Sequence, residues 1–213
     1  MPKQNMKYLY HFTLMLLIIL ALSGCGIKQI TNIPDGKPKG YVQFFEDSYK
    51  FQYKIYEIQG YHEEYIGKLV QKKYLLIDFE PGEHFLKLQM HGAIRKFDIE
   101  VIENQITPVL VHVKFIDSHW NVSGITTTYE VTPPEIGDPI PYILDKSHKE
   151  FIIHALNSRY YSTRIAMLLK LKEYINCMDD EIAEHLDWII QNETNYRIKD
   201  LAISLKNEYL TDK

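Results

Sequence analysis

Residues 109–116 read Val-Leu-Val-His-Val-Lys-Phe-Ile, and this stretch decides how the first half of the chain folds. Val109, Val111, Val113 and Phe115 occupy every second position, which is typical of a strand with one buried face. The same period recurs upstream and downstream, with turn residues between the runs. We therefore predict strands at residues 41–45, 51–58, 66–70, 74–79, 85–90, 96–101, 109–116 and 122–131. Because no helix-length segment separates them, we expect an antiparallel, immunoglobulin-like β-sandwich over residues 41–132.

Beyond this region the period changes to that of helices, so the fold class is α+β. Residues 133–146 contain Pro133-Pro134 and Pro139-Ile140-Pro141, and are predicted to be a semi-rigid linker. A small all-α domain of four helices is expected over residues 147–213. The four starts are predicted from capping residues at Ser147, at Ser162 or Thr163, at Asp179 or Asp180, and at Thr194.

The helical half contains a short internal echo. Thr163-Arg164-Ile165 with Leu168 recurs 33 positions later as Tyr196-Arg197-Ile198 with Leu201. Stacked helix pairs repeat at this spacing, so the segment weakly resembles HEAT repeats. A plain four-helix bundle remains the alternative.

The first 24 residues are typical of an export signal. Lys3 and Lys7 precede an apolar segment from Thr13 to Leu22, and no acidic residue occurs before Asp35. A membrane span is the competing interpretation, but it needs about 20 apolar residues and this run is about half as long.

The end of this segment, Leu22-Ser23-Gly24-Cys25, resembles the lipobox of bacterial lipoproteins. The resemblance implies cleavage before Cys25 and acylation (palmitate or a related chain) of that cysteine, with residues 25–40 as a tether. Gly26 directly after the cysteine favours the outer membrane, on the periplasmic or the surface side. The alternative is an ordinary secretory signal with a chance cysteine.

Charge and cysteine content exclude several classes of protein. Removing residues 1–24, which carry two lysines and no acid, changes the net charge from −4 to −6. With no basic cluster, nucleic acid is not an expected partner. With Cys25 acylated, Cys177 is the last thiol of the chain, so no intramolecular disulfide is expected and the fold must be held by packed cores.

The strand region carries a second resemblance. Tyr65-Ile66-Gly67-Lys68-Leu69, then Tyr74, then Pro81-Gly82-Glu83-His84 is similar to PEGA-like sandwiches, and more closely to an uncharacterised family of small bacterial lipoproteins. It covers about residues 41–115, although Glu64-Tyr65 replaces the usual Asp-Gly or Asn-Gly. Gly67 is expected in a tight turn and Gly82 at positive φ. The resemblance implies a non-catalytic envelope domain and carries over no catalytic residue.

Motifs for catalysis and metal binding are missing from the sequence. It contains no H-E-x-x-H, G-x-S-x-G, Gly-rich phosphate loop or C-x-x-C. His84, His91 and His112 lie in or beside predicted strands without a matching carboxylate or cysteine, and are interpreted as scattered surface or edge residues. We therefore predict no catalytic residue, no metal and no cofactor apart from the covalent lipid on Cys25.

Residues 41–65 are unusually aromatic. An edge that binds glycans or partners would use five of these side chains: Tyr41, Phe44, Tyr53, Tyr56 and Tyr61. The alternative is ordinary core and strand packing, for which Tyr and Phe are well suited.

Together these patterns predict a non-enzymatic, lipid-anchored envelope protein that acts as an interaction or scaffold module. Its expected partners are the membrane and envelope proteins. The alternative function is binding of glycan or peptidoglycan fragments through the aromatic edge.

Overall fold

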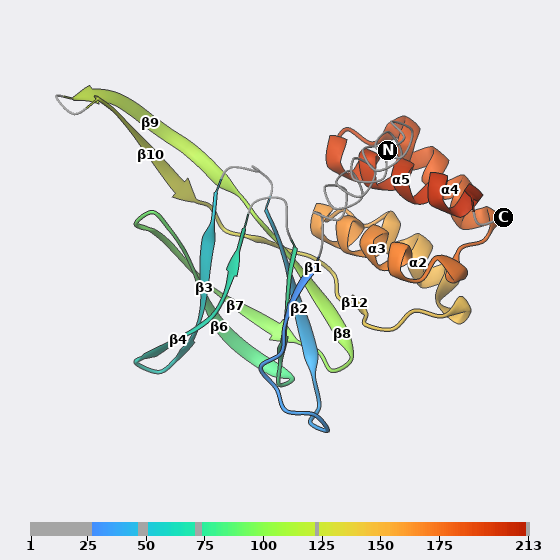
Figure 1. Ribbon diagram of the computed structural model, residues 1–213, viewed down its shortest axis with the longest axis horizontal. Helices are drawn as coiled ribbons and strands as arrows, with labels where there is room; N and C mark the ends of the chain where they lie inside the picture. Colours follow the sequence, from blue (N-terminus) through green and yellow to red (C-terminus); the bar gives the residue numbers. More distant parts are fainter. Residues whose placement is uncertain (1–26, 47–50, 71–73, 122–123, 212–213) are drawn as a thin grey trace, which may run out of the picture.

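A computed structural model describes residues 27–46, 51–70, 74–121 and 124–211. Strands come first along the chain and helices last, which confirms the predicted mixed α+β class (Figure 1). The predicted signal and acylation residues lie outside the described ranges.

The strands match the predicted runs closely, with additions at both ends of the strand region. Their bounds are β1 Ile27–Ile30, β2 Gly40–Glu46, β3 Tyr53–Gln59, β4 His62–Leu69, β5 Tyr74–Phe79, β6 Gly82–Met90, β7 Ala93–Val101, β8 Gln105–Val111, β9 Val113–Asn121, β10 Gly124–Val131, β11 Glu135–Ile136 and β12 Ile140–Pro141.

The described strands form three sheets. Sheet A has the order β1-β5-β2-β8-β11, with β12 also paired to β8, and sheet B has the order β4-β3-β6-β7. β9 and β10 pair with each other as a separate two-stranded ribbon, called the arm below.

Sheet A is mixed, which corrects the expectation of purely antiparallel strands. β1 runs parallel to β5, and β2 runs parallel to β8. A parallel neighbour requires a crossover connection, and here the strands of sheet B lie in the chain between β2 and β8. An apolar period of two identifies strands but does not show which sheet each strand joins. A crossover made of strands instead of a helix is therefore not visible in the sequence.

Sheets A and B bury a shared apolar cluster between their facing surfaces. Val42 and Phe44 of sheet A and Ile55, Leu86 and Leu88 of sheet B are completely buried in it. Tyr41 and Phe45, which alternate with them in β2, point the other way, toward the helices. The three central strands of sheet A, β2, β5 and β8, therefore each contribute to two clusters.

The stretch at residues 109–116, predicted as one strand, is divided between two sheets. β8 ends at Val111 in sheet A, and β9 begins at Val113 in the arm. Val109, Leu110 and Val111 are all buried, because both faces of sheet A are covered. Beyond His112 the alternation continues, but Phe115 and Ile116 are both exposed.

The predicted linker at residues 133–146 is built into the sheet. β11 pairs with Leu110 and Val109, and β12 pairs with Ile106 and Gln105. Gly137 lies so close to the helices that an added Cβ would meet the hydroxyl oxygens of Thr163 and Ser162 at 2.4 and 2.5 Å. The prolines therefore shape edge strands that continue directly into the helices.

Part of the predicted tether at residues 25–40 is also paired. β1 forms four residue pairs with β5, from Ile27 opposite Tyr74 to Ile30 opposite Ile77. Gly67 lies within β4 instead of in the expected tight turn, whereas Gly82 has the expected positive φ of 141°.

Four α-helices follow, at α2 Lys149–Leu156, α3 Tyr161–Glu173, α4 Asp180–Asn192 and α5 Tyr196–Thr211, with short 3₁₀ turns η1 Lys146–His148 and η2 Ile175–Cys177. Asp179 caps α4 as predicted, accepting a hydrogen bond from the Ile182 amide at 3.0 Å. The first capping box is formed by Asp145 and His148 around η1, so the predicted start at Ser147 is wrong by two residues. α5 is capped by Asn195, which accepts from Arg197 and Ile198, instead of by Thr194.

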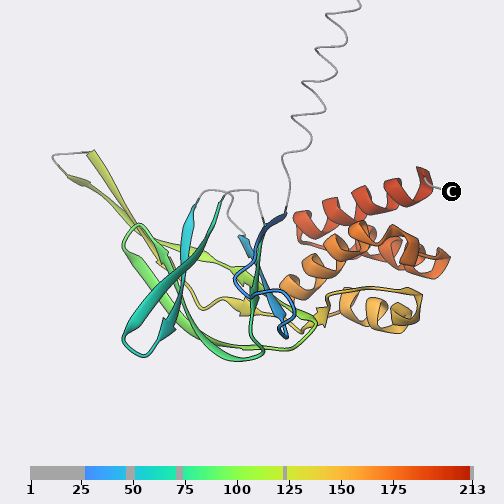
Figure 2. The ribbon, with the colours of Figure 1, turned by 60° about the horizontal axis from the view of Figure 1, so that its bottom comes forward.

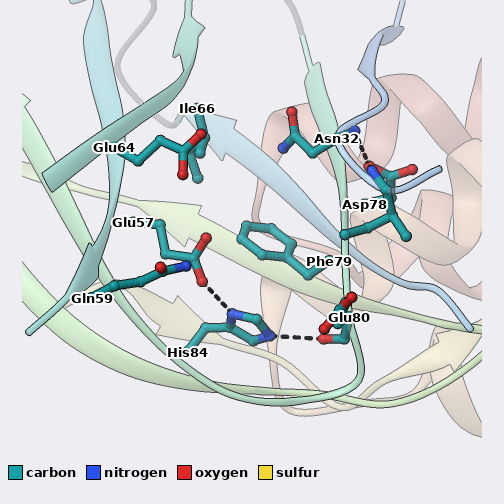
Figure 3. A pocket seen from close by; sticks show the side chains of 10 residues that line it. Asn32, Glu57, Gln59, Glu64, Ile66, Asp78, Phe79, Glu80 and His84 are labelled. Carbon is teal, nitrogen blue, oxygen red and sulfur yellow. Dashed lines mark hydrogen bonds and ion pairs between the residues drawn. The ribbon is translucent and has the colours of Figure 1, made fainter. Parts of the chain in front are cut away.

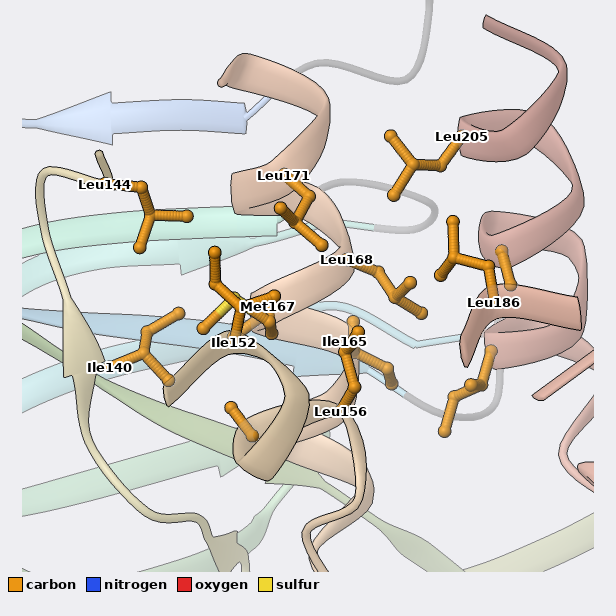
Figure 4. Packing of buried hydrophobic residues seen from close by; sticks show 14 of the residues in the cluster. Ile140, Leu144, Ile152, Leu156, Ile165, Met167, Leu168, Leu171, Leu186 and Leu205 are labelled. Carbon is orange, nitrogen blue, oxygen red and sulfur yellow. The ribbon is translucent and has the colours of Figure 1, made fainter. Parts of the chain in front are cut away.

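α3 starts without a side-chain cap at Tyr160, so Ser162 and Thr163 lie in its first turn instead of at its cap. The helices pack together and cover the outer face of sheet A in one continuous cluster (Figures 1 and 4). Ile152, Leu168, Leu186 and Leu205 meet there with strand residues such as Leu110. Within the described ranges, every helix is too short or too polar to cross a bilayer.

Candidate functional site

A cavity of about 220 Å³ opens at the end of the two sheets where β1 and β5 finish (Figure 3). It lies between sheet A, the β3–β4 hairpin of sheet B and the beginning of β6. Ten residues line it: Asn32, Ile33, Glu57, Gln59, Glu64, Ile66, Asp78, Phe79, Glu80 and His84. Four of these are carboxylates, so the cavity is acidic.

His84 is held on both sides of its ring. Its Nδ1 lies 2.6 Å from Glu57 Oε1, and its Nε2 lies 2.7 Å from the carbonyl oxygen of Glu80 (Figure 3). The ring also packs on Phe79, with ring centroids 4.9 Å apart. Both partners are acceptors, so an imidazole protonated on both nitrogens satisfies both bonds and a neutral ring satisfies one.

The arrangement of His84 follows from the register of sheet B. Glu57 of β3 is opposite Leu86 of β6, and His84 is two positions before Leu86 on the same face. The imidazole therefore ties β3 to the turn between β5 and β6. It connects structural elements and leaves no ring nitrogen directed at the cavity.

Asp78 anchors the loop after β1. This carboxylate is almost completely buried and accepts hydrogen bonds from the backbone amides of Asn32 at 2.5 Å and Ile33 at 3.3 Å. Lys39 Nζ lies 3.3 Å from its second oxygen. The charge of Asp78 is thus compensated by the loop that it holds.

The remaining polar groups of the cavity are the side chains of Asn32, Gln59, Glu64 and Glu80, all of which are exposed to solvent. Phe79 and Ile66 supply the apolar wall. Chemically the cavity can accept hydrogen bonds or a positive charge. Its lining residues include no Ser, Thr, Cys or Lys, and both ring nitrogens of His84 are already bonded to acceptors.

Among the described residues, no three His, Cys, Asp or Glu side chains lie close enough to hold a metal ion. The predicted absence of a cofactor stays a prediction.

The five aromatic residues predicted to form a binding edge are dispersed by the fold. Phe44 and Tyr53 are 0% exposed and belong to the cluster between the sheets. Tyr41 faces the helices, where its ring stacks on Tyr142 at 3.8 Å between centroids. Burial raises the pKa of Tyr41 to about 12, with Tyr142 and then Asp78 adding to the effect. These three residues are core or interface residues, which corrects their assignment to an exposed edge.

Tyr56 and Tyr61 do lie toward solvent. Tyr56 sits on the outer face of sheet B, with its ring 5.6 Å from that of Tyr65 and with Lys87 Nζ 4.1 Å above it. Tyr61 is in the turn between β3 and β4 and is fully exposed. Cys25, Leu22, Ser23 and Gly24 are outside the described residues.

The sequence alone does not reveal the pairing of Glu57 with His84. The two residues are 27 positions apart, and their contact depends on β3 lying next to β6. The sequence places His84 in or beside a strand without a matching carboxylate. Its partner Glu57 becomes visible only when the order and register of the strands are known.

No protein-family profile and no curated protein sequence matches the chain.

Proposed function

We propose that the protein is a non-enzymatic bacterial lipoprotein, anchored in the cell envelope by acyl chains on Cys25. The observation that carries the anchor is the sequence Leu22-Ser23-Gly24-Cys25 after a short apolar segment with two preceding lysines. Acyl chains contribute about 0.8 kcal/mol per buried methylene, so two or more of them suffice for stable attachment. Gly26 supports placement in the outer membrane.

We further propose that residues 41–132 are a PEGA-like, immunoglobulin-like β-sandwich and that the helices are HEAT-like. Support for the sandwich comes from two sheets with one apolar cluster between them. Support for the repeat comes from Arg164 of α3 and Arg197 of α5, which are 33 positions apart in the sequence echo and each donate to a backbone carbonyl.

An interaction role is supported by α5. Tyr196, Ile203 and Leu210 are spaced seven residues apart on this helix, and all three are exposed. A spacing of seven keeps side chains on nearly the same side of a helix, so they form one apolar stripe facing away from the core. We propose that this stripe contacts another envelope protein.

The anchor is tested by labelled-palmitate incorporation. Wild-type protein should carry label and sediment with membranes, and Cys25→Ala should carry none. Gly26→Asp should move the labelled protein from the outer to the inner membrane fraction. Unlabelled wild-type protein in the soluble fraction would contradict the proposal.

The stripe is tested by cross-linking in intact cells. The double variant Ile203→Ser with Leu210→Ser should lose a cross-linked partner that wild type retains. Ser204→Ala with Thr211→Ala is the matched control, because these exposed residues have the same spacing and lie about 100° around the helix from Ile203 and Leu210. Equal recovery from both double variants would refute the role of the stripe.

A second candidate function is glycan binding on the outer face of sheet B. It is favoured by Tyr65, which is 55% exposed beside Tyr56, since exposed aromatic rings stack on sugars. Retention of the wild type on immobilised peptidoglycan, and its loss in Tyr65→Ala, would support this function. Passage of the wild type without retention would exclude it.

A further inference from the structure

The start of β1 and the root of the arm lie at the same end of sheet A. Strand pairing places Lys28 of β1 opposite Leu75, Leu75 opposite Phe44, and Phe44 opposite Val109 of β8, so these residues form one row across the sheet. β1 is parallel to β5, β2 is antiparallel to β5, and β8 is parallel to β2. The chain before Lys28 and the chain after Val109 therefore leave the row in the same direction.

Distances along the chain then limit where a lipid on Cys25 can place the bilayer. Cys25 is three residues before Lys28, so it lies at most about 10 Å from the row. The first arm residue, Val113, is four residues beyond Val109, which is a similar distance. β9 continues for nine residues, or about 30 Å, and projects from the body (Figures 1 and 2).

We propose that the arm, β9 with β10, lies against the bilayer that holds the acylated Cys25. This inference rests on the proposed lipid anchor and adds a second membrane contact to it. The arm extends farther from the row than the anchor can reach, so a bilayer held by the anchor lies within reach of the arm.

The side chains of the arm fit such a surface. Phe115 and Ile116 are 55% and 48% exposed. As neighbours in a strand they point to opposite faces of the ribbon, so either face presents an apolar side chain to the bilayer. The charged residues of the arm, Lys114, Asp117 and Glu130, lie in its proximal half. Farther out, the described side chains of Ser118, Thr127 and Thr128 are uncharged.

The depth of the contact is limited by the backbone. In the described ranges β9 and β10 pair with each other alone, so each has an outer edge of amides and carbonyls without strand partners. Hydrocarbon offers such groups no hydrogen bonds, whereas the headgroup region contains water and polar oxygens. The arm therefore lies in the headgroup region and does not span the membrane.

The test uses full-length acylated protein in vesicles of phosphatidylethanolamine and phosphatidylglycerol. Ile116→Cys carries an environment-sensitive fluorophore on the introduced thiol, and Phe115→Cys is a second labelling site in case the first variant misfolds. Ile143→Cys is the matched control, because Ile143 is 63% exposed and follows β12 at the opposite end of β8. The native Cys177 is buried, and burial raises the pKa of its thiol, so it reacts poorly.

Vesicles contain a lipid with a nitroxide either on the headgroup or deep in the acyl chain. We expect the headgroup nitroxide to remove most of the emission at position 116 and little at position 143. No quenching at 116, equal quenching at both positions, or stronger quenching by the deep nitroxide would each overturn the inference. Palmitate labelling of the same preparation separates the two proposals: without label the lipid anchor fails, whereas labelled protein with an unquenched arm refutes the membrane contact alone.

Discussion

Asp179 combines two roles at the start of α4. Its carboxylate accepts the Ile182 amide, and its second oxygen lies 2.8 Å from Lys149 Nζ. The bond from Lys149, followed by the backbone bond, lowers the pKa of this carboxyl below its ordinary value of 3.8. A carboxyl with a lowered pKa stabilises the fold above the ordinary value, and this contribution is lost as pH falls toward the folded-state value.

We predict that Asp179→Ala lowers the free energy of unfolding by about 1 kcal/mol at neutral pH, which is the usual effect of losing such a cap. Urea denaturation of both proteins should show this difference shrinking as pH is lowered below 3.8. Asp179→Asn is the control, because it keeps the cap without the charge and should lose less. A deficit that does not depend on pH would show that the carboxylate charge is irrelevant.

Arg197 connects the helices to sheet A through one buried side chain. It donates to the Glu46 carbonyl and lies over the Tyr74 ring, 4.9 Å from its centroid. We predict that Arg197→Met costs about 2 kcal/mol of stability, since a buried hydrogen bond to a charged group typically contributes 1.5–3 kcal/mol. Arg159→Met is the exposed counterpart and should cost much less in the same denaturation experiment. Equal losses would mean that the buried contact contributes nothing specific.

The cap at Asp179 was predictable from the sequence, whereas contacts between distant residues were not. The cap at Asp179 depends on the next three residues, so its pattern is visible in the chain. The pairs of Arg197 with Glu46 and of His84 with Glu57 depend on which elements become neighbours. The order of residues along the chain does not by itself show which elements become neighbours.

β1 packs closely against a glycine of β4. Gly67 of β4 leaves space for it, because an added Cβ would lie 2.9 Å from Ile30 Cδ1 and 3.1 Å from Leu75 Cδ2. Gly67→Val should therefore overpack this contact and destabilise the protein by about 1–3 kcal/mol. Limited proteolysis should cut the 31–39 loop faster in this variant than in wild type.

The double variant Gly67→Val with Ile30→Val provides the control. Ile30→Val removes the Cδ1 atom nearest to the new side chain, so the double variant should lose less stability than the sum of the single losses. Additive losses would place the effect of Gly67 elsewhere in β4.

The elements themselves were predicted well where one face is exposed. β7 alternates between exposed and buried positions, and its predicted strand at 96–101 lies within the observed one. β5 is buried at all six positions, because helices cover one face of sheet A and sheet B covers the other. Alternation identifies a strand but does not indicate what covers its second face, so the packing of the helices could not be predicted.

The predicted tether at residues 25–40 and the predicted linker at residues 133–146 both contain short strands that the sequence did not reveal. Residues 25–40 are rich in Gly, Pro and Lys, a composition that predicts a tether, and residues 133–146 contain four prolines, which predict a linker. β1, β11 and β12 are short edge additions of two to four residues, which pair because a neighbouring edge is available. Short strands of this kind carry too few residues to show a period.

At the scale of the whole molecule, sheet A belongs to two apolar clusters at once. Phe44 and Val109 face sheet B, whereas Phe45 and Leu110 face the helices. Loss of either cluster exposes one face of the same strands. We therefore predict that strands and helices unfold in a single cooperative transition, despite the division into two regions suggested by the sequence.

A substitution in sheet B provides the sharpest test of this coupling. Leu88→Ala empties a completely buried position far from the helices and should cost about 2–5 kcal/mol. In a Trp120→Phe background, Trp188 of α4 is the remaining tryptophan, so its fluorescence reports on the helices alone. If sheet A couples the clusters, Leu88→Ala lowers the urea midpoint of Trp188 fluorescence as much as that of the far-ultraviolet circular dichroism.

Leu168→Ala, within the helical cluster, should shift both signals in the same way. A Trp188 midpoint that Leu88→Ala leaves unchanged would mean that the helices fold independently of the strands, and that the surface they share with sheet A is an interface between two domains instead of part of one core.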